Sequence, residues 1–254
     1  MTLKELSFKV NGIDASESYL MCAKQCRDAL GDAIDIVYEK SQLERPKKAT
    51  MLELIDSPVV TTFLNNSEMV NALHYVRILG MNAEHGKAVR KKEAELALEN
   101  IKLFVYYLET KEASGDSSFK LPKHMNELET RRLYVDKYLE EAGWEVLEKK
   151  NVPQPGKAGI EIEVSGMPNK KGEGYCDYVL YGRDCKPLAI VEVKKTALDP
   201  AVGRHQVDLY GDCMEKVYGY RPVLYYTNGY ETKVIDGIYP DRTVMAFHTL
   251  QELE

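Results

Sequence analysis

The sequence predicts an α/β (α+β) protein in which an α-helical bundle precedes a mixed β-sheet flanked by helices. Over residues 1–112, apolar side chains recur at three- and four-residue steps, which is the spacing of amphipathic helices. Beyond residue 126, short apolar runs of strand length lie between two helical stretches. A small, polar, turn-forming stretch at residues 113–118 separates the two patterns. We therefore expect two domains, residues 1–115 and residues 116–254.

The first domain is expected to be a helical bundle that follows a short extended start. One periodic set of apolar side chains runs from Tyr19 to Val37, and a second runs from Ala94 to Leu108. Cys22 and Cys26 lie four residues apart in the first set, and we interpret them as buried small residues rather than zinc ligands. The chain has 5 cysteines, and this odd number argues against a disulfide framework.

Composition favours a cytoplasmic globular protein. No apolar run approaches the roughly 18 residues that a membrane span needs, so no membrane partner is expected. The N-terminus lacks the apolar stretch of a secretory signal. The formal net charge of -6 is unfavourable for a protein that binds DNA alone, because such proteins usually carry a basic surface. If the chain acts on DNA, another part or partner must supply most of the affinity.

The second domain begins with a predicted helix over residues 126–142, whose apolar face carries Leu128, Val135, Leu139 and Ala142. A second helix is predicted over residues 200–218, beginning at Pro200. The predicted strands are Trp144–Leu147, Ile160–Val164, Tyr175–Tyr181, Leu188–Val193, Val223–Tyr226, Lys233–Ile235 and Val244–Phe247. This order of elements is typical of a mixed sheet with helices against it.

Three ionisable residues are predicted to meet on one hairpin of this sheet. A turn centred between Asp184 and Cys185 would pair Asp177 with Glu192 across two antiparallel strands. Glu192 and Lys194 are two residues apart, so they project from the same face of their strand. Taken alone, a Glu-x-Lys sequence is most often a salt bridge at a strand edge; the Asp at this offset is what favours a catalytic interpretation.

Two opposed carboxylates repel each other unless a cation lies between them. Their oxygens suit Mg²⁺ or Mn²⁺, which could polarise a phosphate and activate a water, and Lys194 could steady the charge on that phosphate. Gln206 and Tyr210 are four residues apart and share one helical face. Lys195 is either an exposed charge or a phosphate contact. The pattern indicates phosphodiester hydrolysis.

The second domain resembles the PD-(D/E)xK nucleases and, more specifically, the endonuclease domain of Type I restriction R subunits. Asp177 and Glu192-Val-Lys194 match the nuclease motif, and Val202-Gly-Arg-His-Gln206-Val-Asp-Leu-Tyr210 is similar to the QxxxY motif of the R subunits. The similarity covers roughly residues 125–254. Its further segments are Glu127–Arg132, Ala142–Trp144, Val164–Asn169, Lys186–Thr196, Arg221–Val223 and Tyr226–Thr232.

The resemblance implies a role for each matching residue. Asp177 and Glu192 would be metal ligands and Lys194 the catalytic lysine, with the main-chain carbonyl of Val193 as a further ligand. Residues implied to position the site or the DNA are Gln206, Tyr210, Lys195, Glu127 and Arg131. For Glu127, the alternative is a carboxylate that only interacts with the dipole of its helix.

Two positions depart from the family pattern. Cys185 stands where a hairpin glycine is expected, and a positive φ without glycine costs about 1 kcal/mol, so another turn type is the alternative. The family's Glu-Ala-Lys-Arg is Glu192-Val-Lys-Lys195 here, which keeps the same chemical groups.

The first domain resembles the HEPN-like segment of some R subunits through Arg77–His85. In some HEPN proteins an Arg and a His cut RNA, but a helix junction or a docking surface is the simpler interpretation. No GxxxxGK[ST] sequence occurs, so ATP is expected to bind the full-length subunit rather than this chain. The resemblance implies DNA and the methylase and specificity subunits as partners. A non-catalytic module that docks the motor subunit onto those subunits is the alternative function.

Overall fold

A computed structural model describes the backbone of residues 1–114 and 125–254, with the side chains of residues 1–111 and 125–254. The chain divides into two compact units, Met1–Pro122 and Lys123–Glu254. The predicted domain boundary between residues 115 and 116, like most of the predicted linker 113–118, lies outside the described residues. We describe each unit by itself.

The first unit is a helical bundle, as predicted. Its helices are α1 (Leu3–Asn11), α2 (Tyr19–Lys40), α3 (Met51–Ile55), α4 (Pro58–Leu64), α5 (Ser67–Glu84) and α6 (Lys91–Ser114). The predicted extended start is wrong, because Thr2 and Glu5 form a capping box that begins α1 at Leu3. Cys22 and Cys26 are fully buried and free, as their helical spacing indicated.

The second unit is built on a seven-stranded sheet whose strands are adjacent in chain order. They are β1 (Glu145–Lys150), β2 (Lys157–Ser165), β3 (Glu173–Tyr181), β4 (Pro187–Val193), β5 (Val223–Thr227), β6 (Thr232–Ile235) and β7 (Arg242–Val244). The pairs β1–β2 and β4–β5 are parallel, and the other neighbouring pairs are antiparallel. The protein is thus a mixed α/β structure whose sheet is mixed, as the sequence predicts.

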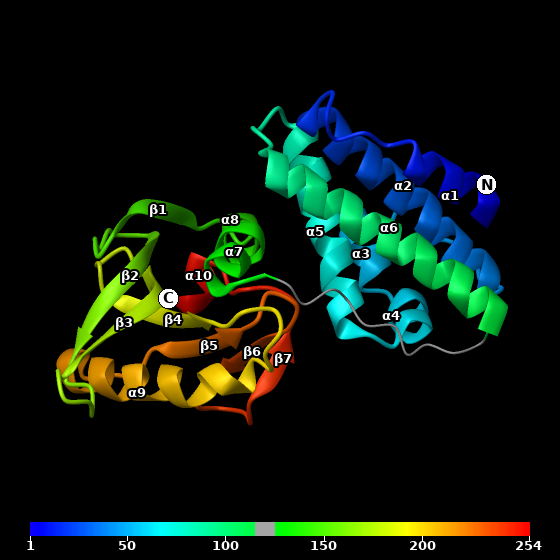
Figure 1. Ribbon diagram of the computed structural model, residues 1–254. Coiled ribbons are helices and arrows are strands. Elements are labelled where there is room, and N and C mark those ends of the chain that lie inside the picture. Colours follow the sequence, from blue (N-terminus) through cyan, green and yellow to red (C-terminus); the bar gives the residue numbers. More distant parts are fainter. Residues whose placement is uncertain (115–124) are drawn as a thin grey trace. The chain divides into compact units, whose positions relative to one another are not determined.

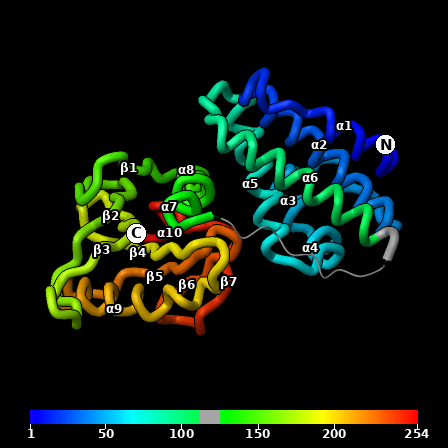
Figure 2. The backbone as a smooth tube through the Cα atoms, viewed as in Figure 1, coloured from blue at the N-terminus to red at the C-terminus, as the bar shows by residue number. Residues whose placement is uncertain are grey.

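Helices cover both faces of this sheet (Figures 1 and 2). Helix α9 (Ala201–Tyr218) connects β4 to β5 and packs on one face, which we call the α9 face. The other face, here the α8 face, is covered by α7 (Glu127–Thr130), η1 (Arg131–Val135), α8 (Asp136–Glu141) and α10 (Leu250–Leu253). Buried apolar side chains alternate between these faces along β4: Ala189, Val191 and Val193 point to the α8 face.

The predicted helix over residues 126–142 contains a π turn. It runs from Glu127 to Glu141, and the residues Arg131–Val135 form the π segment. A π turn holds an extra residue, so it rotates the residues before it relative to those after it. Leu128 is therefore 47% exposed and does not share the buried face of Val135 and Leu139, which corrects the prediction of one continuous apolar face.

The β3–β4 hairpin has the predicted register. Tyr178 pairs with Val191, Val179 with Ile190 and Leu180 with Ala189, and the pairing ends one residue before Asp177 and Glu192, which follow in the same alignment. At the turn, Cys185 adopts a φ of 61° and its N–H donates to the carbonyl of Gly182 at 2.9 Å. The positive φ expected of a glycine is thus adopted here by a cysteine.

The last strand is shorter than predicted and lies earlier in the chain. β7 ends at Val244 because Val244 pairs with Thr232, the first residue of β6, and no partner continues beyond it. Phe247 of the predicted strand Val244–Phe247 instead fills the core from a loop. None of the helices in the described ranges is long and apolar enough to cross a membrane.

Candidate functional site

The candidate site lies at the edge of the sheet where β4 ends, just beyond the last pair that joins β3 and β4. Asp177 is 8% exposed and Glu192 is 2% exposed. One oxygen of Asp177, Oδ2, accepts the N–H of Val193 at 2.8 Å, so the carboxylate caps the end of the neighbouring strand. The structure places both predicted carboxylates in one buried region, where the charge of Asp177 raises the pKa of Glu192.

A chain of hydrogen bonds links β4 to α9. The amine of Lys194 donates to Glu192 Oε1 at 2.6 Å and to Gln206 Oε1 at 2.9 Å. Gln206 Nε2 donates to the hydroxyl of Tyr210 at 2.9 Å, and that hydroxyl donates to the carbonyl of Tyr175 at 2.9 Å. Lys194, Gln206 and Tyr210, which the sequence suggested as a functional set, are therefore in one network that fixes the lysine.

Two glycines permit this close packing. A Cβ on Gly203 of α9 would lie 3.2 Å from Cγ of Glu192 and 3.4 Å from Cε of Lys194. A Cβ on Gly174 of β3 would lie 2.6 Å from Cε1 of Tyr210. Larger residues at either position would push α9 or its tyrosine away from the strands, so the network depends on these close approaches.

Burial controls the charge state of the two carboxyls. Burial, followed by repulsion from Asp177, raises the pKa of Glu192 to about 8, although the hydrogen bond from Lys194 opposes the shift. Burial likewise raises the pKa of Asp177 to about 6, against the influence of Arg131 and the Val193 N–H. Burial would lower the pKa of Lys194, but its hydrogen bond to Glu192 and the charge of that residue raise it overall. The lysine is therefore an ammonium beside two carboxyls that resist ionisation.

The donor set suits a hard divalent cation. Glu192 Oε2 is buried and has no hydrogen-bond partner, which is costly for a carboxylate oxygen unless something else binds it. Oxygen donors from Asp177 and Glu192 are those that Mg²⁺ and Mn²⁺ prefer. Across the described ranges, no three His, Cys, Asp or Glu side chains are grouped to hold a metal ion. The available set is thus two carboxylates, with the Val193 carbonyl as a predicted third donor.

The other predicted site residues lie around this pair. Arg131 is buried, and its Nη1 is 3.2 Å from Asp177 Oδ1. Glu127, in the first turn of α7, is exposed, and its charge acts on Asp177, Glu192 and Lys194. Lys195 is also exposed. The guanidinium of Arg131 is therefore committed to a carboxylate in this structure, whereas Lys195 is open to solvent.

Two residues contribute to the site without having been singled out in the sequence. The hydroxyl of Thr196 accepts the N–H of Met125 at 3.2 Å and donates to its carbonyl at 3.4 Å, which ties the start of α7 to the end of β4. Glu161 of β2 accepts a hydrogen bond from Arg131 at 3.2 Å. Neither residue stands out in the sequence, because one threonine after a strand and one glutamate in an alternating strand are common features.

In the first unit, Arg77 and His85 differ in burial and in their positions on α5. Arg77 is buried and its Nε donates to Nδ1 of His74 at 3.3 Å, while Nε2 of that histidine lies 2.8 Å from Asp56 Oδ1. His85 is exposed at the C-cap of α5. This arrangement is the hydrogen-bonded helix junction that the sequence analysis offered as the simpler interpretation.

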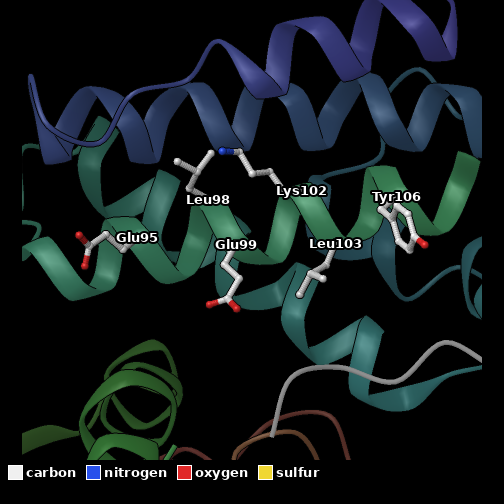
Figure 3. Close-up of a pocket in the computed structure, with 6 residues that line it drawn as sticks. All are labelled: Glu95, Leu98, Glu99, Lys102, Leu103 and Tyr106. Carbon is white, nitrogen blue, oxygen red and sulfur yellow. The ribbon is translucent and has the colours of Figure 1, made fainter. Parts of the chain in front are cut away.

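A pocket of the first unit runs along α6. Figure 3 shows its six lining residues on that single helix, so it is a surface groove and not a cavity enclosed by several elements. The lining residues are Glu95, Leu98, Glu99, Lys102, Leu103 and Tyr106. Neither Arg77 nor His85 lines it.

No protein-family model matches the sequence, and no curated protein matches it. Among solved structures, the chain is similar to a fragment of an HsdR subunit of a type I restriction enzyme from Vibrio vulnificus YJ016. The two are 29% identical over 51% of this chain, with a TM-score of 0.40. The similarity covers 24% of that HsdR chain, so the present chain matches about a quarter of its length.

Proposed function

We propose that this chain is a metal-dependent DNA endonuclease module of a Type I restriction R subunit. The observation that carries the proposal is the buried Glu192 Oε2, which has no hydrogen-bond partner, near Asp177 and two residues before a lysine that the other Glu192 oxygen holds. The resemblance of Asp177 and Glu192-Val-Lys194 to the PD-(D/E)xK motif supports the same conclusion. We assign the second unit to that nuclease fold and the first to a HEPN-like bundle on the same basis.

In this proposal Asp177 and Glu192 hold Mg²⁺ or Mn²⁺, with the carbonyl of Val193 as a further ligand. When bound, the cation supplies Lewis-acid chemistry to a DNA phosphate. Binding also offsets the burial that raises the pKa of both carboxyls and the repulsion from Asp177 that adds to the shift of Glu192. The two acidic side chains thus serve as a preformed set of oxygen donors.

Lys194 is the residue that acts on the substrate. Glu192 and Gln206 accept two of its three N–H groups, which leaves one to donate to a phosphate oxygen or to the attacking water. Its raised pKa keeps it protonated, as stabilisation of a developing negative charge requires. Tyr210 holds Gln206 in place, so both are positioning residues. Lys195, which follows Lys194 in the chain and is exposed, is suited to contact the DNA backbone.

The net charge of -6 leaves this chain poorly suited to bind DNA by itself. We infer that ATP-driven translocation by a motor region outside this chain delivers the DNA. In the same model, the methylase and specificity subunits choose the target. A single site of this kind cuts one strand, so a double-strand break needs two events or two copies.

Mutation of the site in the restriction complex tests the proposal. Asp177→Ala and Lys194→Ala should abolish cleavage of plasmid DNA while ATP hydrolysis continues, because the motor does not use these residues. Lys186→Ala, an exposed lysine at the far end of the hairpin, is the matched control and should cut normally. Persistent cleavage by either site variant refutes the proposed site. A complex that assembles and hydrolyses ATP but never cuts, even as wild type, favours the docking-module alternative.

A further inference from the structure

Glu161 has an unusual backbone for a strand residue. Its φ is 46°, in the left-handed region, although it lies in the middle of β2. The other non-glycine residues with positive φ in the described chain lie in turns or at a helix end: Gln42, Asn65, Asn151 and Cys185. A left-handed residue with a side chain costs about 1–2 kcal/mol, so it persists only where the surroundings enforce it.

This conformation reverses the faces of β2. Ala158 and Ile160 pack on the α8 face, whereas Ile162 and Val164 pack on the α9 face. In a regular strand all four would lie on the same face. The register places Glu161 beside Asp177 of β3, since Ile160 pairs with Tyr178 and Ile162 with Cys176. The apolar side chains of β2 therefore switch from one face of the sheet to the other at Glu161, which lies level with the candidate site.

The Glu161 side chain belongs to an ion cluster that includes Asp177. Its Oε1 lies 3.2 Å from Arg131 Nη1, and the same nitrogen lies 3.2 Å from Asp177 Oδ1. Its Oε2 lies 2.6 Å from the amine of Lys150. The guanidinium of Arg131 also stacks over the ring of Tyr178, with 5.1 Å between its carbon and the ring centroid. One arginine nitrogen is thus shared between two carboxylates.

Two irregular backbone segments converge on this shared contact. Arg131 is the first residue of the π turn, and Glu161 is the left-handed residue of β2. Neither irregularity is needed to form a helix or a strand, and π turns are frequent at functional sites. Arg131 contacts Asp177 directly, and Glu161 contacts the same nitrogen of Arg131. The ion cluster therefore depends on two irregular backbone segments, which distinguishes it from an ordinary surface ion pair.

The shared nitrogen creates a competition. If Asp177 takes up a divalent cation, the guanidinium beside it is repelled, and its buried charge then needs another acceptor. Glu161 offers that acceptor at the same distance. We propose that Glu161 is a positioning residue that retains the Arg131 guanidinium when Asp177 binds a divalent cation, so that arginine and cation do not compete. This inference rests on the proposed function, because it requires Asp177 to be a metal ligand.

Titration of the metal-free protein with Mn²⁺, followed by electron paramagnetic resonance of the free ion, tests the inference. Glu161→Gln keeps the size of the side chain but removes its charge, and should weaken Mn²⁺ binding about tenfold or more. Glu163→Gln, two residues along the same strand and exposed, is the control and should bind like the wild type. Adding Arg131→Met to Glu161→Gln should restore most of the lost affinity, because the competing cation is then gone. A merely structural ion pair would not give that rescue.

Each outcome bears on the inference. A folded Glu161→Gln variant that binds Mn²⁺ as tightly as the wild type overturns it, even if its melting temperature falls. If Glu161→Gln does not fold, Glu161→Gly relieves the left-handed backbone while removing the same carboxylate, and gives the same comparison. A wild-type protein that binds no Mn²⁺ overturns the proposed function and this inference with it. Wild-type binding with an unaffected Glu161→Gln variant rejects only the role of Glu161.

Discussion

Replacing Glu192 by glutamine is expected to stabilise the metal-free protein. The side chain is 2% exposed and one of its oxygens has no partner, so its ionised form is poorly accommodated. Burial and the charge of Asp177 raise its pKa from 4.5 to about 8. Glutamine keeps the shape and the acceptor for Lys194 without the charge. An active-site variant that is more stable than the wild type is the signature of a site organised for binding.

The size of the effect follows from proton linkage. A carboxyl whose folded pKa lies above its unfolded pKa stabilises the fold fully below pH 4.5, and this contribution is lost as the pH rises toward 8. At about 1.4 kcal/mol per pH unit, the wild type loses up to about 3 kcal/mol by pH 7. The variant lacks this loss. The two proteins should therefore be similarly stable near pH 4 and diverge steadily above it.

Urea unfolding in a metal chelator measures this difference. The chain has one tryptophan, Trp144, which is buried in the second unit, so its fluorescence reports on the unit that contains Glu192. Glu163→Gln serves as the control because Glu163 is exposed, and it should change the unfolding free energy by less than about 0.5 kcal/mol. A Glu192→Gln variant that is less stable at pH 7, or whose advantage does not depend on pH, would show the reasoning to be wrong.

Three further substitutions test how the site is supported. Gly174→Ala places a Cβ 2.6 Å from the ring of Tyr210, so we expect a loss of about 1–3 kcal/mol in urea unfolding together with slower DNA cleavage; unchanged values would contradict the close approach. Cys185→Gly relieves a φ of 61° and should raise the unfolding free energy by about 0.5–1 kcal/mol, and a decrease would argue against the left-handed turn residue. Thr196→Val leaves the buried backbone groups of Met125 without their partner and should cost about 1–3 kcal/mol, whereas Thr196→Ser should keep most of the stability; equal losses in both would count against the hydroxyl contact.

Much of the second unit could be predicted because the sequence patterns that determine it are local. The apolar runs of β3 and β4 and the turn between them set the hairpin register, which placed Asp177 beside Glu192 without knowledge of the fold. The spacing of two residues between Glu192 and Lys194 fixed their common face, and the spacing of four between Gln206 and Tyr210 fixed theirs. These relations depend only on the periods of a strand and a helix.

The remaining features depend on tertiary contacts that no local pattern encodes. The left-handed conformation of Glu161 and the π turn at Arg131 accompany an ion pair between residues 30 positions apart in the sequence. The end of β7 is set by where β6 begins, which the apolar residues around Phe247 do not reveal. The exposed Leu128 follows from the π turn in the same way.

The central claim is that Asp177 and Glu192 together bind a divalent cation. Anomalous X-ray scattering from crystals soaked in Mn²⁺ locates the ion directly. We predict one strong peak bridging the two carboxylates, at roughly 2.0–2.3 Å from their oxygens, and no such peak in Glu192→Gln crystals treated alike. A map of well-ordered wild-type crystals with no manganese between Asp177 and Glu192 would contradict the account.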